Sequence, residues 1–232
     1  MPPQLPDPPL TPVRHVVYLH GFASSPASSK ARRFGAELSA RGVGFACPDL
    51  NEPGFESLTV TRMVGQAREA IREAARTPVA LVGSSLGAFV ALQAAAAEDT
   101  GRVDRLVLLA PALDFGGNRL RRLGAAGVDD WRRTGRLRVF HYGRGEPADV
   151  GFGLYEDASA YDAFALHVRW PTLVFQGRRD DAVDPAMVER WCASRPHVAL
   201  RLLEDDHPLT ASIDLIWKES ARWFAIEETG FP

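Results

Sequence analysis

One short string constrains the fold of this chain more than any other feature: Gly-Ser-Ser-Leu-Gly at residues 83–87. It follows the apolar run 79–82 and leads into an apolar, alanine-rich stretch over 88–94. That context predicts a strand, a sharp turn and a helix, the setting in which G-x-S-x-G raises a nucleophilic side chain above a sheet edge. The flanking glycines suit such a turn, because a Cβ at either place would collide with neighbouring backbone. Ser85 would then lie at a helix N-terminus, where backbone N–H groups favour developing negative charge.

Segments typical of strands and of helices alternate along the chain. Apolar, β-branched runs predict strands at 13–19, 43–47, 79–82, 103–110, 172–176 and 198–203. Helical spacing of apolar residues predicts helices at 29–40, 57–76, 86–97, 185–193 and 210–226. Strands that alternate with helices indicate right-handed βαβ units. We therefore predict a three-layer α/β fold, with a mostly parallel sheet and helices on both of its faces.

Two stretches depart from this alternation. The proline-rich start, 1–12, has neither a basic n-region nor an apolar h-region, so we predict a disordered tail, followed by a single domain over 13–232. The segment 114–169 separates two expected strands and holds a basic, helix-like part and then a hairpin near 137–155. Open α/β sheets bind ligands at the carboxyl ends of their strands, where such an insertion would lie. We predict a small cap that shapes a substrate site; an exposed surface excursion is the alternative.

Composition argues against several classes of function. The 232 residues include 27 Lys and Arg against 29 Asp and Glu, so a net charge of −2 gives no basis for binding nucleic acid or an anionic membrane. No apolar stretch approaches the roughly 18–20 residues that span a bilayer. The two cysteines, Cys47 and Cys192, make no disulfide framework, and no metal-ligand spacing occurs. We expect a cytoplasmic monomer or homodimer that takes a small-molecule substrate and uses no metal or organic cofactor.

A serine hydroxyl at neutral pH needs a neighbouring base, and that base needs an acid to orient it. His207 is the best placed of the 6 histidines, because it lies in a loop between the last expected strand and the final helix. The other histidines lie inside or next to expected strands, or within the insertion: His15, His20, His141, His167 and His197. We predict that His207 is the base.

The acid is expected in the loop after the preceding strand, since sites built on a strand–turn–helix serine place nucleophile, acid and base in that order along the chain. Gly177 ends the expected strand over 172–176, and Asp180 lies three positions further on. Asp181 and Asp184 are rivals for the role in the same loop. We predict Asp180 as the acid, whose task is to hold the imidazole tautomer and to stabilise the imidazolium.

Acyl transfer also needs two backbone N–H donors for the oxyanion. The residue after the nucleophile, Leu86, supplies one donor, and a loop after an earlier strand supplies the other. The H-G-F segment after the first expected strand is such a loop, in which Gly21 lets the backbone bend and Phe22 offers its N–H. We predict an oxyanion hole formed by Phe22 and Leu86. We expect His20, Gly21 and Ser84 to contact the substrate.

Two stretches resemble motifs of a known family. Residues 20–31 read H-G-F-A-S-S-P-A-S-S-K-A, which is similar to the H-G-F-x-S-S-P-x-S-x-K-A opening of the small bacterial YqiA-like esterases, the UPF0227 group. The V-G-S-S-L-G string over 82–87 matches the elbow of that group, and nearly the whole chain resembles the α/β-hydrolase superfamily. Residues 49–51 and the insertion over 114–169 are not matched to that group.

The resemblance implies an α/β-hydrolase fold and a carboxylesterase that acts on short-to-medium acyl esters without a cofactor. Ser85, Asp180 and His207 would form its catalytic triad, and the reaction would pass through an acyl-enzyme. An acyl-thioester hydrolase, acting on acyl-CoA or acyl-protein, is an alternative with the same catalytic residues. A non-catalytic binding module is a further alternative, although such a protein would be expected to lack a triad member.

The insertion also carries the apolar side chains that we expect to wall an acyl pocket. They are Phe115, Leu120, Leu123, Trp131, Phe140, Tyr142, Phe152 and Tyr155. A hydrophobic wall discriminates by about 1–3 kcal/mol per methylene group, so the preference for acyl chain length should be graded rather than absolute.

Overall fold

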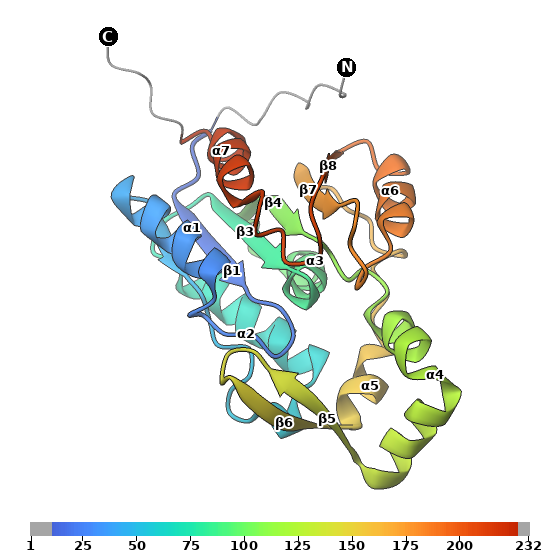
Figure 1. The fold of residues 1–232 in the computed structure, drawn as a ribbon. Helices are drawn as coiled ribbons and strands as arrows, with labels where there is room; N and C mark the ends of the chain where they lie inside the picture. The colour runs from blue at the N-terminus through green and yellow to red at the C-terminus, as the bar shows by residue number, and fades with distance from the viewer. Residues whose placement is uncertain (1–10, 227–232) are drawn as a thin grey trace.

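A computed structural model describes residues 11–226, without the side chains of residues 116–122. Most of the predicted tail over 1–12 therefore lies outside the described residues. The main sheet has 6 strands in the order β2-β1-β3-β4-β7-β8, and neighbouring strands are parallel (Figure 1). These strands are β1 (His15–Leu19), β2 (Gly44–Ala46), β3 (Val79–Ser84), β4 (Val103–Leu109), β7 (Thr172–Gly177) and β8 (Val198–Leu203). The predicted parallel sheet is confirmed.

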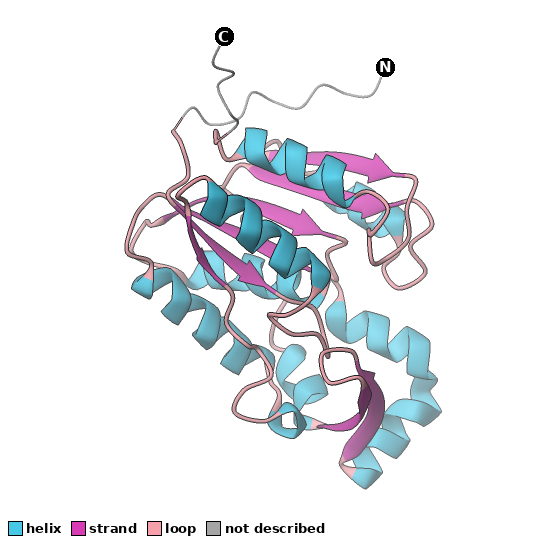
Figure 2. Ribbon diagram, turned by 60° about the vertical axis from the view of Figure 1, so that its left-hand side comes forward, coloured by secondary structure: helices cyan, strands magenta, loops and turns pink. Residues whose placement is uncertain are grey.

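Helices cover both faces of this sheet (Figure 2). On one face, α1 (Ser29–Ala40) and α7 (Ile213–Trp223) bury their apolar sides against the strands. On the other face, α2 (Val60–Glu73), α3 (Leu86–Ala97) and α6 (Pro185–Ala193) enclose a second apolar core. The predicted three-layer fold is confirmed, and it leaves the carboxyl ends of the strands free to carry a site.

Helix α3 is buried on every side, from Leu86 to Ala95. It packs on β3 and β4 and is covered by α2 and by Phe115 of the insertion. A helix that is apolar all round belongs in the core of a protein, which explains why its sequence has no amphipathic pattern. No helix within residues 11–226 is long and apolar enough to cross a membrane. The central place of α3 gives the residue before it, Ser85, a rigid support.

The insertion folds as a small unit beside the main sheet. Its elements are α4 (Phe115–Thr134), β5 (Arg136–His141), β6 (Glu146–Gly151) and α5 (Gly153–Ala158). The two strands pair antiparallel in a sheet of their own, as the expected hairpin requires. The turn of this hairpin contacts the loop after β1, since the Gly143 N–H donates to the Ala23 carbonyl at 3.1 Å. The insertion therefore lies next to the carboxyl ends of the main strands (Figure 1).

Two helices begin later than the apolar periodicity predicts. Helix α2 begins at Val60 rather than at 57, because the side chain of Thr59 caps it and the 3-10 helix η1 (Phe55–Ser57) comes before. Helix α7 begins at Ile213 rather than at 210, because a backbone N–H just before it donates to the Asp205 carboxylate. Thr59 caps α2 and Asp205 holds the residue before α7, and apolar spacing alone reveals neither contact.

Candidate active site

The turn between β3 and α3 holds Ser85 in a strained conformation, with φ 54° and ψ −115°. A Cβ at Gly83 would lie 2.4 Å from the Ala88 Cα, and a Cβ at Gly87 would lie 2.0 Å from the Leu19 carbonyl oxygen. Both positions therefore require glycine, as the motif predicts. Strain of this kind persists where the surrounding packing enforces it, and here it turns the Ser85 side chain away from the helix that follows.

The structure brings together the three side chains that the sequence singled out. His207 Nε2 lies 3.0 Å from Ser85 Oγ, and His207 Nδ1 lies 2.9 Å from Asp180 Oδ2. Because the carboxylate accepts the Nδ1 proton, the neutral ring leaves Nε2 as an acceptor for the serine hydroxyl. The hydrogen bonds thus run from hydroxyl to imidazole to carboxylate across 122 and 27 residues of sequence.

Asp180 is held as an ionised acceptor at the end of β7. Its side chain is 0% exposed. Oδ1 accepts the N–H groups of Ala182 and Val183, each at 2.8 Å, and Oδ2 also accepts Gln176 Nε2 at 2.8 Å. Burial alone would raise the pKa of Asp180, but the hydrogen bonds, above all that from His207, outweigh it and hold the pKa below its ordinary value. The carboxylate is therefore charged where it faces the imidazole.

The rivals of Asp180 lie elsewhere in the loop. Asp184 is the N-cap of α6 and accepts the Ala186 N–H at 3.0 Å, which explains its place before Pro185. Asp181 lines the cleft described below. The sequence predicts Asp180 over these two rivals, and the structure places Asp180 against the imidazole.

The loop that carries His207 is fixed by a buried carboxylate on its N-terminal side. Asp205 is 3% exposed, and it accepts the N–H groups of Asp206 at 2.9 Å and of Ser212 at 2.8 Å. Burial would raise the pKa of Asp205, yet these bonds hold it below its ordinary value. Leu209 adopts a positive φ of 55°, which closes the loop into a tight turn. Sequence reasoning missed Asp205, whose only signal was its place beside the predicted base.

The two predicted oxyanion donors belong to separate segments. Leu86 is the first residue of α3, so its N–H has no acceptor within the helix. Phe22 follows Gly21, whose carbonyl accepts a hydrogen bond from His20 Nδ1 at 2.9 Å. In a trans peptide the carbonyl and the next N–H point in opposite directions. The His20 ring therefore fixes the plane of the peptide that carries the Phe22 N–H.

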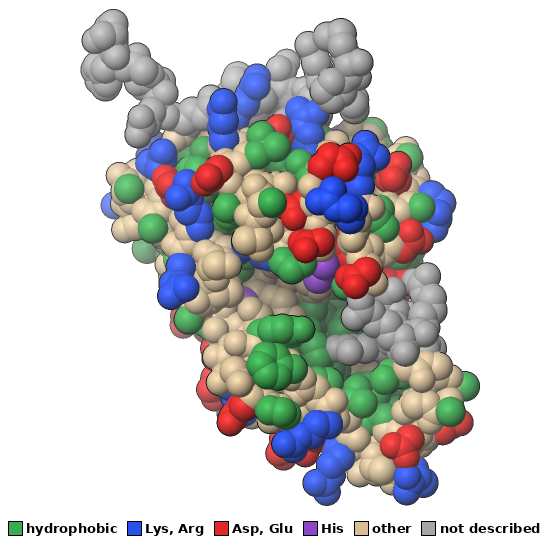
Figure 3. Space-filling view, viewed as in Figure 1, with side chains coloured by type: hydrophobic (Ala, Val, Ile, Leu, Met, Phe, Trp, Pro, Cys, Tyr) green, Lys and Arg blue, Asp and Glu red, His purple; other side chains and the backbone are tan. Residues whose placement is uncertain are grey.

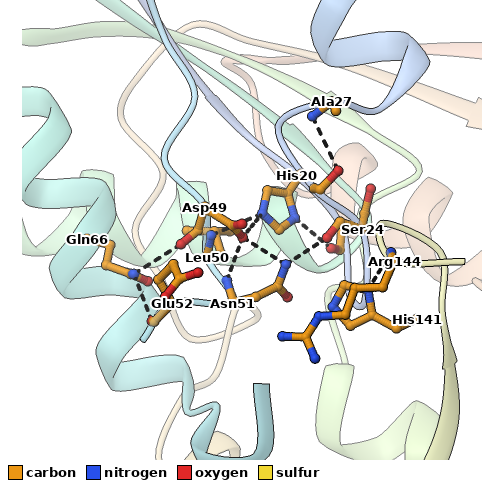
Figure 4. Close-up of polar contacts among 12 residues, drawn as sticks. His20, Ser24, Ala27, Asp49, Leu50, Asn51, Glu52, Gln66, His141 and Arg144 are labelled. Carbon is orange, nitrogen blue, oxygen red and sulfur yellow. Dashed lines mark hydrogen bonds and ion pairs between the residues drawn. The ribbon is translucent and has the colours of Figure 1, made fainter. Parts of the chain in front are cut away.

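A polar network holds this loop from the side of residues 49–51 (Figure 4). The Leu50 N–H donates to His20 Nε2 at 3.0 Å, and Asp49 Oδ1 lies 3.3 Å from the same nitrogen. Asp49 Oδ1 accepts Asn51 Nδ2 at 2.8 Å, and the same amide donates to the Ser24 carbonyl at 2.7 Å. Residues 49–51, which were not matched to the family motif, thus support the loop of Phe22.

Ser85 lines a cleft of about 650 Å³ between the sheet and the insertion. Figure 3 shows the hollow, with apolar side chains beside it. Its apolar lining includes Phe22, Leu86, Ala112, Phe115, Tyr142 and Val183. Its polar lining includes Tyr18, Ser28, Ser29, Lys30 and Asp181. His20, Gly21 and Ser84, the predicted substrate contacts, also line this cleft.

The prediction for the acyl-pocket walls was wrong for much of the insertion. Of the aromatic side chains named, only Phe115 and Tyr142 line this cleft. Trp131 instead packs on Phe152 and Tyr155, with ring centroids 5.5 and 6.0 Å apart. The insertion needs an apolar interior of its own, and these side chains supply it. Two other predicted wall residues also lie away from this cleft: Phe140 is 50% exposed, and Leu123 packs at the edge of the main core. The side chain of Leu120 lies outside the described residues.

No three His, Cys, Asp or Glu side chains converge as metal ligands would among the described residues. At the cleft, a hydroxyl, an imidazole and a carboxylate are hydrogen-bonded in sequence, with backbone N–H groups nearby. These are the components of acyl transfer through a covalent intermediate.

A comparison with models of known protein families finds a match over most of the chain. The model of an uncharacterised protein family (UPF0227) matches residues 15–217. The chain belongs to this family. The resemblance seen in the H-G-F and V-G-S-S-L-G segments is thereby confirmed. No curated protein matches the UPF0227 chain described here.

Solved structures share the fold of this UPF0227 member at low sequence identity. A candidate hydrolase from Agrobacterium vitis S4 is 24% identical with a TM-score of 0.80, covering 91% of this chain and 88% of that one. Alpha/beta hydrolase domain-containing protein 10 from mouse is 21% identical with a TM-score of 0.74, covering 89% and 88%. Est1E from Butyrivibrio proteoclasticus with ferulic acid bound is 17% identical with a TM-score of 0.70, covering 92% and 88%. The chain therefore has the α/β-hydrolase fold.

Proposed function

We propose that this UPF0227 protein is a serine hydrolase that cleaves carboxylic esters of short-to-medium acyl chains. The observation that carries the proposal is the chain of contacts at the cleft, from Ser85 Oγ to His207 Nε2 at 3.0 Å and from His207 Nδ1 to Asp180 Oδ2 at 2.9 Å. A strained serine on a tight turn, paired with a base and a buried acid, has no evident structural purpose. It is the arrangement that activates a hydroxyl.

In the proposed first half-reaction, Ser85 Oγ attacks the acyl carbonyl while His207 Nε2 takes the hydroxyl proton. The carbonyl oxygen becomes an oxyanion, which the N–H groups of Phe22 and Leu86 stabilise. The carbonyl re-forms as the bond to the leaving alcohol breaks, and His207 gives its proton to that oxygen. Asp180 stays ionised throughout and stabilises the imidazolium.

In the second half-reaction, His207 takes a proton from water, and the resulting hydroxide attacks the ester that joins the acyl group to Ser85. The N–H groups of Phe22 and Leu86 again donate hydrogen bonds to the oxyanion. Collapse releases the carboxylic acid, and His207 returns the proton to Ser85 Oγ. The enzyme is thereby restored without a metal or an organic cofactor.

The cleft supports an acyl group of modest size. A volume of about 650 Å³ lies within the usual range for small-molecule sites, and its apolar lining includes Phe22, Phe115 and Val183. Est1E, which shares this fold, has been solved with a carboxylic acid, ferulic acid, bound. Thioester hydrolysis would use the same residues, so thioesters belong in the test as an alternative substrate class.

The test is a panel of p-nitrophenyl esters from acetyl to octanoyl, with butyryl-CoA as the thioester, assayed on pure protein. We expect ester turnover that Ser85→Ala abolishes without loss of the folded state. The exposed Ser39 on α1 provides a matched control, and Ser39→Ala should keep wild-type turnover. Turnover of CoA esters alone would favour the thioesterase alternative. Ester turnover that survives Ser85→Ala at more than a few per cent would contradict the assignment of the nucleophile.

A further inference from the structure

A partly buried lysine contacts the loop of the proposed base. The Lys30 ammonium at the start of α1 donates to the carbonyl oxygen of Pro208 at 2.6 Å, across 178 residues of sequence. Pro208 is the residue directly after His207, so this bond connects α1 to the backbone next to the imidazole. The bond is short and involves a charged donor, which places it among the stronger kinds of hydrogen bond.

Partial burial costs this ammonium some of its hydration. Burial lowers the pKa of Lys30, and the carboxylates of Asp205 and Asp206 oppose that shift. Asp205 is itself occupied by the backbone N–H groups of Asp206 and Ser212. A lysine that served only solubility would extend into solvent, whereas this one ends on a backbone carbonyl inside the cleft lining.

The loop around Pro208 needs an anchor on this side. The His207 side chain is 24% exposed, so packing alone does not enclose its ring, and its position depends on its two hydrogen bonds and on its backbone. Asp205 secures the loop before the imidazole, and Leu209 donates its N–H to the Asp206 carbonyl at 3.2 Å. The Pro208 carbonyl lies between these two fixed points, and Lys30 contacts it from α1.

We propose that Lys30 is a positioning residue for His207: its ammonium holds the Pro208 carbonyl, so that the imidazole stays within reach of both Ser85 and Asp180. The inference rests on the proposed hydrolase function, and it assigns a task to the lysine of the H-G-F-x-S-S-P-x-S-x-K-A segment. Lys30 acts through the loop and takes no part in proton transfer.

The test compares Lys30→Met with Lys218→Met, because Lys218 is exposed on α7 and belongs to no part of the site. We expect Lys30→Met to lower kcat for p-nitrophenyl butyrate by about 10- to 100-fold, since a displacement of about 1 Å costs on the order of 10²-fold. KM should change by less than about twofold, because Lys30 positions a catalytic group and does not bind the acyl chain. Lys218→Met should match the wild type.

Two further readouts separate positioning from a general structural role. The rate at which a fluorophosphonate labels Ser85 should fall with kcat, and the downfield proton resonance of the His207–Asp180 bond should broaden or vanish in Lys30→Met. If Lys30→Met fails to fold, Lys30→Gln keeps a neutral N–H donor, and its kcat should lie between those of Lys30→Met and the wild type.

The outcomes separate a failure of the proposed hydrolase function from a failure of the role given to Lys30. Absence of labelling in the wild type would refute the proposed function itself. A labelled wild type with an unchanged labelling rate and proton resonance in the lysine variants would refute only the role of Lys30. A rise in KM at constant kcat would also overturn it, because the lysine would then bind substrate instead of positioning the base.

Discussion

The loop that carries Phe22 gives a sharp prediction, because one histidine nitrogen fixes the orientation of its peptide. His20 Nδ1 bonds to the Gly21 carbonyl at 2.9 Å, while Nε2 accepts the Leu50 N–H at 3.0 Å. Asparagine places its amide where Nδ1 of histidine lies, and glutamine places its amide nearer to Nε2. His20→Asn should therefore keep the bond to Gly21, and His20→Gln should lose it.

Removal of one complete oxyanion donor costs about 3 kcal/mol, or on the order of 10²–10³ in kcat. Loss of the His20 bond misaligns the Phe22 N–H without removing it, and the Ser24 N–H also reaches the Gly21 carbonyl at 3.2 Å. We expect a smaller effect, about 10- to 100-fold in kcat for His20→Gln and less than about fivefold for His20→Asn. KM should stay nearly constant, because the oxyanion forms only along the reaction.

Steady-state kinetics with p-nitrophenyl butyrate measure this effect, and thermal unfolding supplies the control. His20→Gln disturbs a buried site, so a loss of stability must be separated from a loss of catalysis. Ile71→Val is a suitable reference: Ile71 is 0% exposed in α2, and the change costs about 0.5–1.5 kcal/mol of unfolding free energy away from the cleft. Equal kcat values for His20→Gln, His20→Asn and the wild type would refute the role of His20.

Three further predictions follow from the site. Asp180→Asn should lower kcat severely, by on the order of 10⁴-fold as in a protease triad, whereas Asp181→Asn should be mild; kinetics that reverse this order would move the acid to Asp181. The difference in unfolding free energy between the wild type and Asp180→Asn should shrink as the pH falls below 3.8, in denaturant titrations across pH. The sign follows because a carboxyl with a lowered folded pKa stabilises the fold above its unfolded value and loses that contribution as pH falls through the folded one. Phe115→Ala should shift the preferred ester toward longer acyl chains, while Trp131→Ala should leave the chain-length profile unchanged; a flat profile for both would exclude the cleft wall as a determinant of specificity.

Much of the fold could be predicted because the sequence marks where its elements begin and end. Ser28 caps α1 by accepting the Ala31 N–H, and α1, α3, α6 and β8 have the predicted boundaries. The spacing of apolar residues did not predict a helix start where a polar side-chain contact determines it. The start of α7 depends on a contact with Asp205, whose partner cannot be identified until the loop is folded.

Some residues of the site could likewise be predicted from the sequence, and others could not. Ser85, Asp180 and His207 each follow a strand of a parallel sheet, so chain order was enough to predict that they meet. Lys30 could not be assigned, because its contact with Pro208 spans 178 residues and joins helix α1 to the loop before α7. Nor could apolar character separate Phe115, which lines the cleft, from Trp131, which belongs to the interior of the insertion.

Covalent labelling of the intact protein by a fluorophosphonate, followed by peptide mass spectrometry, tests whether Ser85 is an activated nucleophile. We expect one adduct per chain, located on Ser85, absent from Ser85→Ala and strongly slowed in His207→Gln. A label on another residue, or no label on a folded wild-type protein, would contradict the assignment of Ser85 as an activated nucleophile.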